Sequence, residues 1–344
     1  MAAALRTGDR PGGGRFACSI RMKALDTFPR LLGDIGGTNA RFAWQQAPDS
    51  NPADVAVYPC ADYDTLYAAI QEYLLTNSKS TPAACAIGIA NPITGDRVKM
   101  TNHHWSFSIA QLKIQLGVAR LVVINDFTAL ALALPSLPAA DLHQIGRGKA
   151  MQGSNIALLG AGTGLGVSGL VASHSGQQIP VTGEGGHVTL AAHDDHEAAV
   201  VQHLRQRFGH VSAERVLSGP GLVNLYQTLC ALAAHRGEPL DAATIIARAR
   251  TGEDAQCATA LDLFFNFLGS VAGDLALTLG ACGGVYIGGG IVPRLITELE
   301  RSSFRDRFES KGRFRDYLRN IPTWVINTKV SPAFLGAARA LDMH

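Results

Sequence analysis

Short apolar runs alternate along the chain with longer segments in which apolar residues recur at helical spacing. The runs are rich in β-branched residues and are bounded by glycine, proline or asparagine, which is typical of strands. Several longer segments begin at aspartate or serine and end at glycine, which is typical of capped helices. In the first third of the chain the pattern predicts strands at residues 31–35, 42–44, 55–58, 85–89 and 121–125, and helices that begin at Asp64 and Ser108 and end near Leu75 and at Gly117.

The same plan restarts at residue 156, after a segment rich in proline, alanine and glycine at 134–154 that predicts a domain boundary. We therefore expect an α/β protein with a small domain at 31–136, a large domain at 137–327, and a C-terminal helix within 328–344 that returns to the small domain. The second half predicts strands on both sides of a turn within 156–172, near 285 and at 324–326, and helices at 195–208, 221–234, 241–250, 255–279 and 332–341.

The first thirty residues differ in composition from the rest. They carry six basic and two acidic side chains, a net charge of +4, so the remainder of a 344-residue chain with a total charge of +2 is near −2. The basic balance thus belongs to this segment and does not indicate a nucleic-acid-binding surface. Because residues 1–30 show no periodicity, we expect a disordered tail, and they lack the continuous apolar run of a secretory signal.

The rest of the composition is typical of a globular protein with a large core that functions in the cytoplasm. With 47% hydrophobic residues, the chain can bury a large core. Its six cysteines show no Cys-x-x-Cys pair, so we expect reduced, mostly buried thiols and no structural zinc site. The most membrane-like stretch, residues 263–273, is too short to span a bilayer and predicts a buried helix. Neither a nucleic acid nor a membrane is therefore expected as a partner.

Three glycine-rich turns follow predicted strands, at residues 33–39, 160–166 and 288–290. In the first, Gly36 and Gly37 let the backbone approach a ligand, and successive N–H groups can hold an anion. Asp34 in the same turn is placed to bind Mg²⁺ through its water shell. The alternative is an ordinary Gly-Gly hairpin. The third turn leads to Pro293, which is expected near the start of a helix. Three such turns can line one nucleotide site.

Two commoner nucleotide motifs do not fit. The chain contains no Gly-x-x-x-x-Gly-Lys-Ser/Thr sequence, which excludes a P-loop. Gly164, Gly166 and Gly169 match Gly-x-Gly-x-x-Gly by letter, but the dinucleotide fingerprint needs a helix that starts within the glycines. Residues 167–172 are a short apolar run that predicts a returning strand, so we treat this match as accidental.

Polar residues near these turns could carry chemistry. Asn125 and Asp126 close a predicted strand, where α/β folds bind ligands, and Asp126 is either a helix N-cap or a base for a hydroxyl proton. Glu184 and His187 share a glycine loop and could bind several hydroxyls, or lie on the surface by chance. Glu214 follows Ser212, an expected N-cap, and is either another such ligand or a favourable charge in a first helical turn.

Three further polar or aromatic clusters stand out in the sequence. His103, His104 and Trp105 could stack on a sugar or a base. The group His193, Asp194, Asp195 and His196 opens a predicted helix, which favours solvated capping over metal binding. The arginine-rich run at 301–319 is interrupted by acids and predicts an exposed amphipathic face.

Eight motifs together resemble the bacterial glucokinase family of the hexokinase, actin and Hsp70-like ATPase superfamily, from about residue 31 to residue 341. They include Gly-Asp-Ile-Gly-Gly-Thr-Asn-Ala-Arg at 33–41, Ile-Asn-Asp-Phe-Thr-Ala at 124–129 and Gly-Glu-Gly-Gly-His at 183–187. The others lie at 91–96, 101–105, 160–166, 210–222 and 288–293.

The resemblance implies a two-lobed, actin-like (ribonuclease H-like) α/β fold that phosphorylates the 6-hydroxyl of glucose with ATP and Mg²⁺ in an interdomain cleft. It also implies a homodimer and the entry step of glycolysis. On the matching positions, Asp126 is the implied base, and Asn125, Asp126, Glu184, His187 and Glu214 hold the sugar. Asp34 is the implied organiser of Mg²⁺, and the implied nucleotide-binding residues are Gly33, Asp34, Ile35, Gly36, Gly37, Thr38, Gly162, Thr163, Gly289 and Gly290, with Gly288 beside them.

Two alternatives stay open on the sequence. A kinase for another hexose or an amino sugar would need few altered contacts. A non-catalytic sugar sensor or repressor of the same fold would need a DNA-binding module, which thirty residues without helical periodicity cannot supply. The chain also lacks the cysteine-rich zinc motif of other sugar kinases and repressors of the superfamily, which favours the zinc-free branch.

Overall fold

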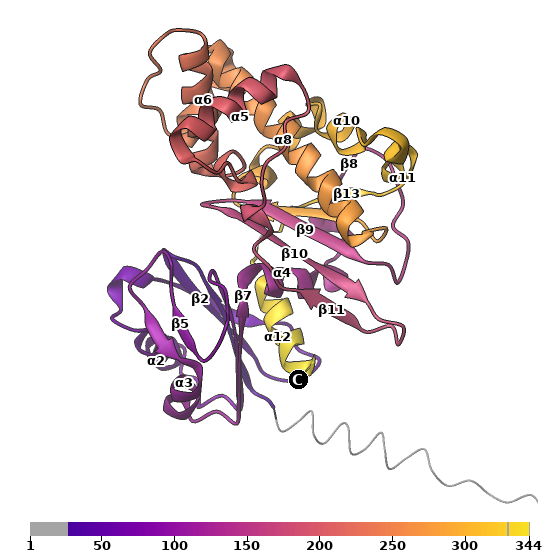
Figure 1. Ribbon diagram of the computed structural model, residues 1–344. Helices are drawn as coiled ribbons and strands as arrows, with labels where there is room; N and C mark the ends of the chain where they lie inside the picture. The colour runs from indigo at the N-terminus through magenta and orange to yellow at the C-terminus, as the bar shows by residue number, and fades with distance from the viewer. Residues whose placement is uncertain (1–26, 329, 344) are drawn as a thin grey trace, which may run out of the picture. The chain divides into compact units, whose positions relative to one another are not determined.

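Two mixed β-sheets organise the chain, each with its own covering helices, in a computed structural model that describes residues 27–328 and 330–343 (Figure 1). Unit 1 runs to Asp126 and includes the segment from Ala333, and unit 2 comprises Phe127–Pro332. The predicted tail lies outside the described residues up to residue 26. Its predicted end at residue 30 is wrong, because Arg30 begins the first strand and pairs with Gln45.

The sheet of unit 1 has the order β3-β2-β1-β4-β7, in which β1 pairs antiparallel with β2 and parallel with β4. All five strands and both helices predicted in this region are present. Thr65 rather than Asp64 caps the first helix, because the Thr65 side chain accepts the N–H of Ala68. The elements are β1 (Arg30–Ile35), β2 (Asn39–Gln45), β3 (Ala53–Pro59), η1 (Cys60–Asp62), α2 (Leu66–Thr76), β4 (Ala84–Ile89), β5 (Arg97–Lys99), β6 (Ser106–Ser108), α3 (Ile109–Leu116), β7 (Arg120–Asn125) and α12 (Ala333–Met343).

Helices cover both faces of this sheet. On one face, α2 and α3 bury an aromatic group in which the rings of Phe42 and Tyr73 lie 5.6 Å apart. On the other, α12 packs Phe334 against the alanines and leucines of β1 and β4, and Arg30 pairs with Asp342 at 2.7 Å. The C-terminal residues are thereby part of unit 1.

Unit 2 contains a six-stranded sheet of order β11-β10-β9-β12-β13-β8. Most of its helices lie on one face, and α4 lies on the other (Figure 1). The unit boundary falls within α4, before the predicted boundary at residue 136, because α4 packs on this sheet. The elements are α4 (Asp126–Ala133), η2 (Leu134–Ser136), η3 (Ala139–Asp141), β8 (Leu142–Ile145), β9 (Ile156–Ala161), β10 (Leu165–Ala172), β11 (Gln178–Val181), η4 (Gly185–His187), α5 (Asp195–Phe208), η5 (Ala213–Arg215), α6 (Gly219–Leu232), α7 (Ala242–Thr251), α8 (Ala255–Leu279), β12 (Val285–Gly289), η6 (Val292–Arg294), α9 (Ile296–Arg301), α10 (Phe304–Glu309), η7 (Gly312–Phe314), α11 (Arg315–Arg319) and β13 (Thr323–Ile326).

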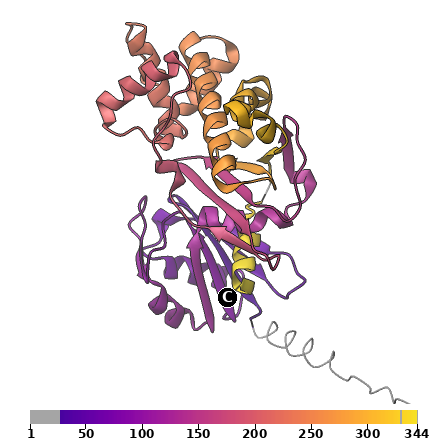
Figure 2. The ribbon, with the colours of Figure 1, turned by 45° about the vertical axis from the view of Figure 1, so that its right-hand side comes forward.

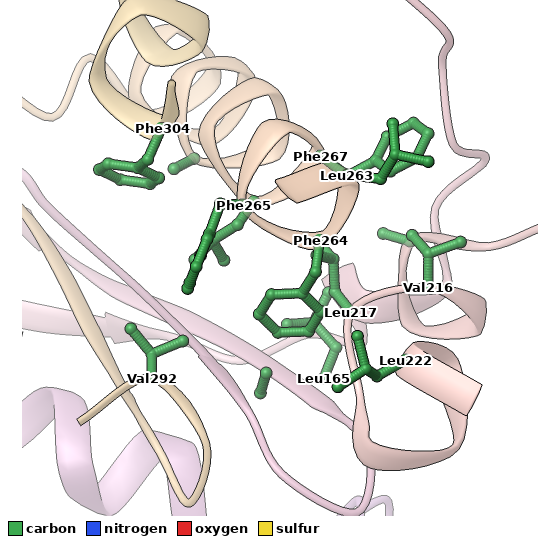
Figure 3. Packing of buried hydrophobic residues seen from close by; sticks show 14 of the residues in the cluster. Leu165, Val216, Leu217, Leu222, Leu263, Phe264, Phe265, Phe267, Val292 and Phe304 are labelled. Atoms are coloured by element: carbon green, nitrogen blue, oxygen red, sulfur yellow. The ribbon is translucent and has the colours of Figure 1, made fainter. Parts of the chain in front are cut away.

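The core of unit 2 forms around α8, the long orange helix above the strands in Figure 2. Its phenylalanines Phe264, Phe265 and Phe267 are fully or almost fully buried among side chains from the strands and from α6 (Figure 3). Among the described residues α8 alone is long and apolar enough to cross a membrane, but 61% of its most apolar window is buried inside the protein. The predicted buried helix at 263–273 is therefore confirmed as part of this longer helix.

The prediction of an exposed face at 301–319 is wrong for α10. A Cβ on Gly269 or Gly273 of α8 would lie within 2.5 Å of a carbonyl oxygen of α10, so the two helices touch along their backbones. Their close approach buries Arg307, which forms an ion pair with the fully buried Glu197 of α5. Small residues four positions apart on α8 were the signal for this contact.

Details at helix starts also differ from the predictions. Asp194 caps α5 as expected, and the N–H of Glu197 and the Arg307 guanidinium hold its pKa below the usual range. Ser212 precedes only a single 3₁₀ turn and makes no side-chain cap, whereas Ser218 caps α6 by accepting the N–H of Gly221 at 2.9 Å. Pro293 likewise lies in a 3₁₀ turn. The described cysteines are free, and all but Cys282 are buried, as predicted.

We predict that Glu197→Ala destabilises the protein by about 3–5 kcal/mol, because it removes the buried partner of Arg307 and leaves only the half-exposed Asp194 near this charge. Urea unfolding followed by circular dichroism measures the effect. The exposed Glu253→Ala is the matched control and should change the free energy of unfolding by less than about 0.5 kcal/mol. Equal effects of the two substitutions would contradict the assignment.

Candidate active site

The start of β10 gathers several of the predicted site residues of unit 2. The N–H of Leu165 donates to Oε2 of Glu214 at 2.9 Å, and a Cβ on Gly164 would lie only 2.4 Å from the same oxygen. The carboxylate therefore rests on the bare Cα of Gly164. Ser218 Oγ donates to the Glu214 carbonyl oxygen at 2.8 Å and so links η5 to the start of α6. These contacts fix a half-buried carboxylate beside the β9–β10 turn.

The loop that carries Glu184 and His187 packs on the same end of β10. A Cβ on Gly186 would lie 2.1 Å from the Leu165 carbonyl oxygen, and one on Gly185 would lie 2.7 Å from Val167. Glycine at both positions thus brings the loop onto the strand. The backbone also joins this loop to η5, since Ala213 N–H donates to the Val188 carbonyl at 3.0 Å.

The structure therefore brings the loop of Glu184 and His187 next to Glu214, which follows Glu184 by thirty residues in the sequence. Glu184 and His187 are exposed, and Glu214 is partly exposed, so their polar groups can reach a ligand.

Two of the three glycine turns are neighbours in unit 2. Strands β9 and β12 run parallel, with Ala161 opposite Gly289, and Gly289 adopts the left-handed φ of +84°. The Ala161 carbonyl accepts the N–H of Gly290 at 3.0 Å, and the Gly162 carbonyl accepts the N–H of Gly219, the first residue of α6, at 2.9 Å. The two turns and the start of α6 thus form one continuous backbone surface.

Some glycines of the predicted nucleotide site cannot offer their N–H groups to a phosphate, although they leave room for one. Within the protein, the N–H of Gly36 donates to Asn39, that of Gly162 to Gly164 and that of Gly290 to Ala161. Anion-binding N–H groups must therefore come from their neighbours. Thr38 and Thr163, one in each hairpin turn, are both exposed and add a hydroxyl to the backbone donor.

Asn125 and Asp126 lie at the end of β7, as predicted, and Asp126 is the first residue of α4. Asn125 Nδ2 donates to Asp126 Oδ1 at 3.0 Å, which orients the carboxylate. Both side chains are partly exposed.

The turn of unit 1 holds Asp34 next to Arg41, whose Nη1 donates to Asp34 Oδ2 at 3.4 Å. The Asp34 side chain is 14% exposed, so a mostly buried carboxylate precedes the Gly36–Thr38 turn in sequence, with its charge partly balanced by Arg41. Ile35 is buried and Gly33 packs on Ile87, which makes both part of the strand that supports the turn.

Asn102 is a residue that the sequence analysis did not single out. A Cβ on Gly37 would lie 3.0 Å from the Asn102 Cβ, so the loop at 101–105 lies directly on the turn. Asn91 anchors this loop by accepting both the N–H and the hydroxyl of Thr101. The motif at 101–105 was the available signal, but its position against Gly37 depends on the fold.

The aromatic residues of this loop do not form a stacking platform. Trp105 is 1% exposed, and its indole N–H donates to the Tyr63 carbonyl at 2.8 Å. The His103 ring packs edge-on against it at 4.9 Å. Desolvation, together with the neighbouring His104, lowers the pKa of His103. The expectation that Trp105 could stack on a sugar or a base is therefore wrong, because the core of unit 1 buries it.

An apolar cavity of about 340 Å³ lies between β10, β11 and α8 in unit 2. Val167, Val271 and Leu275 line it, and its rim carries the ion pair of Lys311 with Asp274. None of the three described side chains Glu184, His187 and Glu214 contributes to its walls. The cavity thus borders the loop that carries Glu184 and His187, through Gly183, Gly185 and Val188, while those two side chains themselves lie outside its walls.

Comparison with known proteins decides the family. A family model described as "Glucokinase" matches residues 31–344. The chain belongs to the glucokinase family. It is 57% identical to a glucokinase of Aromatoleum aromaticum over 318 residues, which covers 92% of this chain and 96% of that protein. It is 50% identical to a glucokinase of Chromobacterium violaceum, with 93% and 91% covered.

A solved structure supports the same conclusion. A glucokinase from an Antarctic psychrotroph superposes with a TM-score of 0.85 at 40% identity, over 92% of this chain and 99% of that one. The resemblance inferred from the motifs is confirmed, and with it the α/β sugar-kinase fold and the class of ATP-dependent hexose kinase.

We predict that Gly164→Ala breaks the hydrogen bond between Leu165 N–H and Glu214, because its methyl group would lie only 2.4 Å from Oε2 and must displace the carboxylate. Hydrogen bonds to charged groups are worth about 1.5–3 kcal/mol, so amide exchange at Leu165 should accelerate about tenfold or more. Native-state hydrogen exchange followed by NMR measures this. Gly95→Ala, where nothing lies within 4 Å of the new methyl, should leave that exchange unchanged. Slow exchange in both variants would contradict the geometry.

Proposed function

We propose that this protein transfers the γ-phosphoryl group of ATP to the 6-hydroxyl of glucose, with Asp126 as the general base. The observation that carries the proposal is the clustering of Glu184, His187 and Glu214 at the start of β10, beside the Gly162–Gly164 turn. A site for several hydroxyls next to a glycine turn suited to phosphates is what a sugar kinase requires.

The acceptor sugar is bound by side chains of complementary hydrogen-bonding capacity. The carboxylates of Glu184 and Glu214 accept hydrogen bonds from hydroxyl groups, and a neutral His187 can donate and accept. The Asn125 amide adds a donor and an acceptor beside the base. Leu165 N–H holds Oε2 of Glu214, and we assign Oε1 to a hydroxyl of the sugar.

Asp126 accepts the proton of the attacking hydroxyl. Asp126 is the first residue of α4, and the hydrogen bond from Asn125 Nδ2 orients its carboxylate. In phosphoryl transfer such a group positions the nucleophile and takes its proton as the bond to phosphorus forms. Closure of the site excludes water, which competes with the sugar for the phosphoryl group.

The nucleotide is held by backbone groups rather than by a lysine. We assign phosphate contacts to the turns at Gly33–Thr38 and Gly162–Thr163, with Thr38 and Thr163 as side-chain donors, and the adenosine to Gly288–Gly290. The left-handed Gly289 and the surface next to α6 support the last assignment.

Mg²⁺ fits the chemistry of Asp34. The ion needs few protein ligands, because water and phosphate oxygens complete its shell, and Asp34 offers one carboxylate at the phosphate turn. When bound, Mg²⁺ would neutralise charge on the transferred phosphate. The proposal also includes the cytoplasmic location and the homodimer that the family resemblance implies.

We predict that Asp126→Asn lowers kcat about 100-fold or more while glucose still binds, because the amide cannot take the proton but keeps the shape of the side chain. A coupled ADP-release assay measures kcat, and isothermal titration calorimetry measures glucose binding. The highly exposed Asp316→Asn is the control. Near-normal turnover of the first variant would refute the role of Asp126.

We predict that kcat/KM is highest for glucose among glucose, mannose, fructose and N-acetylglucosamine. A sugar whose hydroxyl has another orientation leaves the Glu184 or Glu214 carboxylate without its hydrogen bond, and an acetamide in place of a hydroxyl displaces that bond. Either change weakens transition-state binding. The same ADP-release assay gives the four values. A higher kcat/KM for N-acetylglucosamine or mannose would replace glucose as the proposed substrate and leave the kinase chemistry intact.

A further inference from the structure

Three glycines form a row across the sheet of unit 2. Gly160 of β9 pairs with Gly166 of β10 on one side and with Gly288 of β12 on the other. A Cβ on Gly166 would lie 2.1 Å from Cδ2 and Cε2 of Phe127, and one on Gly288 would lie 3.1 Å from Cδ2 of Leu130. Helix α4 therefore packs against the backbone of this row, with Phe127 over Gly166 at one end and Leu130 over Gly288 at the other.

The contact of Phe127 with Gly166 is the more demanding of the two. Leu130 could shift by a few tenths of an ångström, because only the end of a flexible side chain faces Gly288. At Gly166 three atoms of a rigid ring lie within 2.5 Å of the position of a methyl group. Any larger residue at 166 must therefore displace Phe127, and the first turn of α4 with it.

Sequence neighbours connect this contact to the chemistry. Phe127 directly follows Asp126, and Gly166 directly follows Leu165, whose N–H holds Glu214. On one side the ring contact is thus adjacent in sequence to the proposed base, and on the other side it is adjacent to the residue that holds the Glu214 carboxylate. Phe127 is only partly buried, whereas Leu165 is 5% exposed and belongs to the main core. Filling the core is therefore not the main contribution of the Phe127 ring.

We propose that Phe127 is a positioning residue, whose ring, seated on Gly166, holds the Asp126 carboxylate in register with the hydroxyl groups bound at Glu214. This inference rests on the proposed function. In this role Phe127 contacts neither the sugar nor the proton that Asp126 accepts. It acts only by fixing the position of α4. Displacement of a catalytic group by about 1 Å can cost about 10²-fold in rate, so a ring contact of this kind can control turnover.

The test is a double-mutant cycle with Gly166→Ala, Phe127→Ala and the combined variant. Gly166→Ala should lower kcat about 10- to 100-fold while glucose affinity, measured by calorimetry, changes less than about threefold. Phe127→Ala should lower kcat about tenfold. In the Phe127→Ala background, Gly166→Ala should change kcat by less than about twofold, because the methyl group no longer meets a ring. Gly95→Ala and the exposed Phe314→Ala are the controls, with kcat unchanged.

Each outcome decides the inference. Independent, multiplicative losses in the combined variant, or a parent-like kcat in both single variants, would overturn it, while Asp126→Asn measured alongside shows whether the base assignment stands. Normal turnover of Asp126→Asn would overturn both assignments. If Gly166→Ala does not fold, Phe127→Leu and Phe127→Ala carry the test, since they only remove atoms; unchanged kcat in both would overturn the positioning role.

Discussion

The backbone at Gly164–Gly166 is the constraint on which the candidate site of unit 2 depends. Three consecutive residues make three different contacts: Gly164 admits the Glu214 carboxylate, Leu165 donates to it, and Gly166 receives the Phe127 ring. The Leu165 carbonyl also faces Gly186 of the loop that carries Glu184 and His187. Because side chains alternate between the two faces of a strand, one short segment serves the core on one side and α4 on the other.

Glycines in this protein act more by allowing close approach than by flexibility. Gly289 has a left-handed backbone, whereas five other glycines around the site lack one and instead face a neighbour closer than a Cβ could be: Gly160, Gly164, Gly166, Gly185 and Gly186. Gly37 under Asn102 and Gly186 on Leu165 show the same principle in the two units. Substitution at such positions moves the neighbouring segment, and the effect reaches residues that are distant in sequence.

Local pattern predicted the elements and the family but not the contacts between segments. The alternation of apolar runs identified β1, β9, β10 and α8, because strand and helix periodicity is a local property. The positions of Trp105 and Arg307 could not be predicted in this way. The sequence does not show whether an indole or a guanidinium faces solvent or a buried partner. The partners here are the Tyr63 carbonyl for Trp105 and the Glu197 carboxylate for Arg307, and only the packing of the fold brings them into place.

The glycine turns illustrate both sides of this limit. Their sequence indicated anion-binding loops, but it could not show which N–H groups the hairpins themselves use, as at Gly36 and Gly162. The sequence also could not reveal the role of Gly166. This residue matches a dinucleotide motif by letter, but in the structure it contacts Phe127. Such assignments need the pairing register of β9, β10 and β12, which is set by long-range contacts.

The most direct test of the account is a crystal structure with glucose and a non-hydrolysable ATP analogue. The account predicts a carboxylate oxygen of Asp126 within about 2.6–3.2 Å of the glucose 6-hydroxyl, with Glu184, His187 and Glu214 on other hydroxyls of the same sugar. A sugar bound elsewhere, or an Asp126 carboxylate directed away from that hydroxyl, would contradict it.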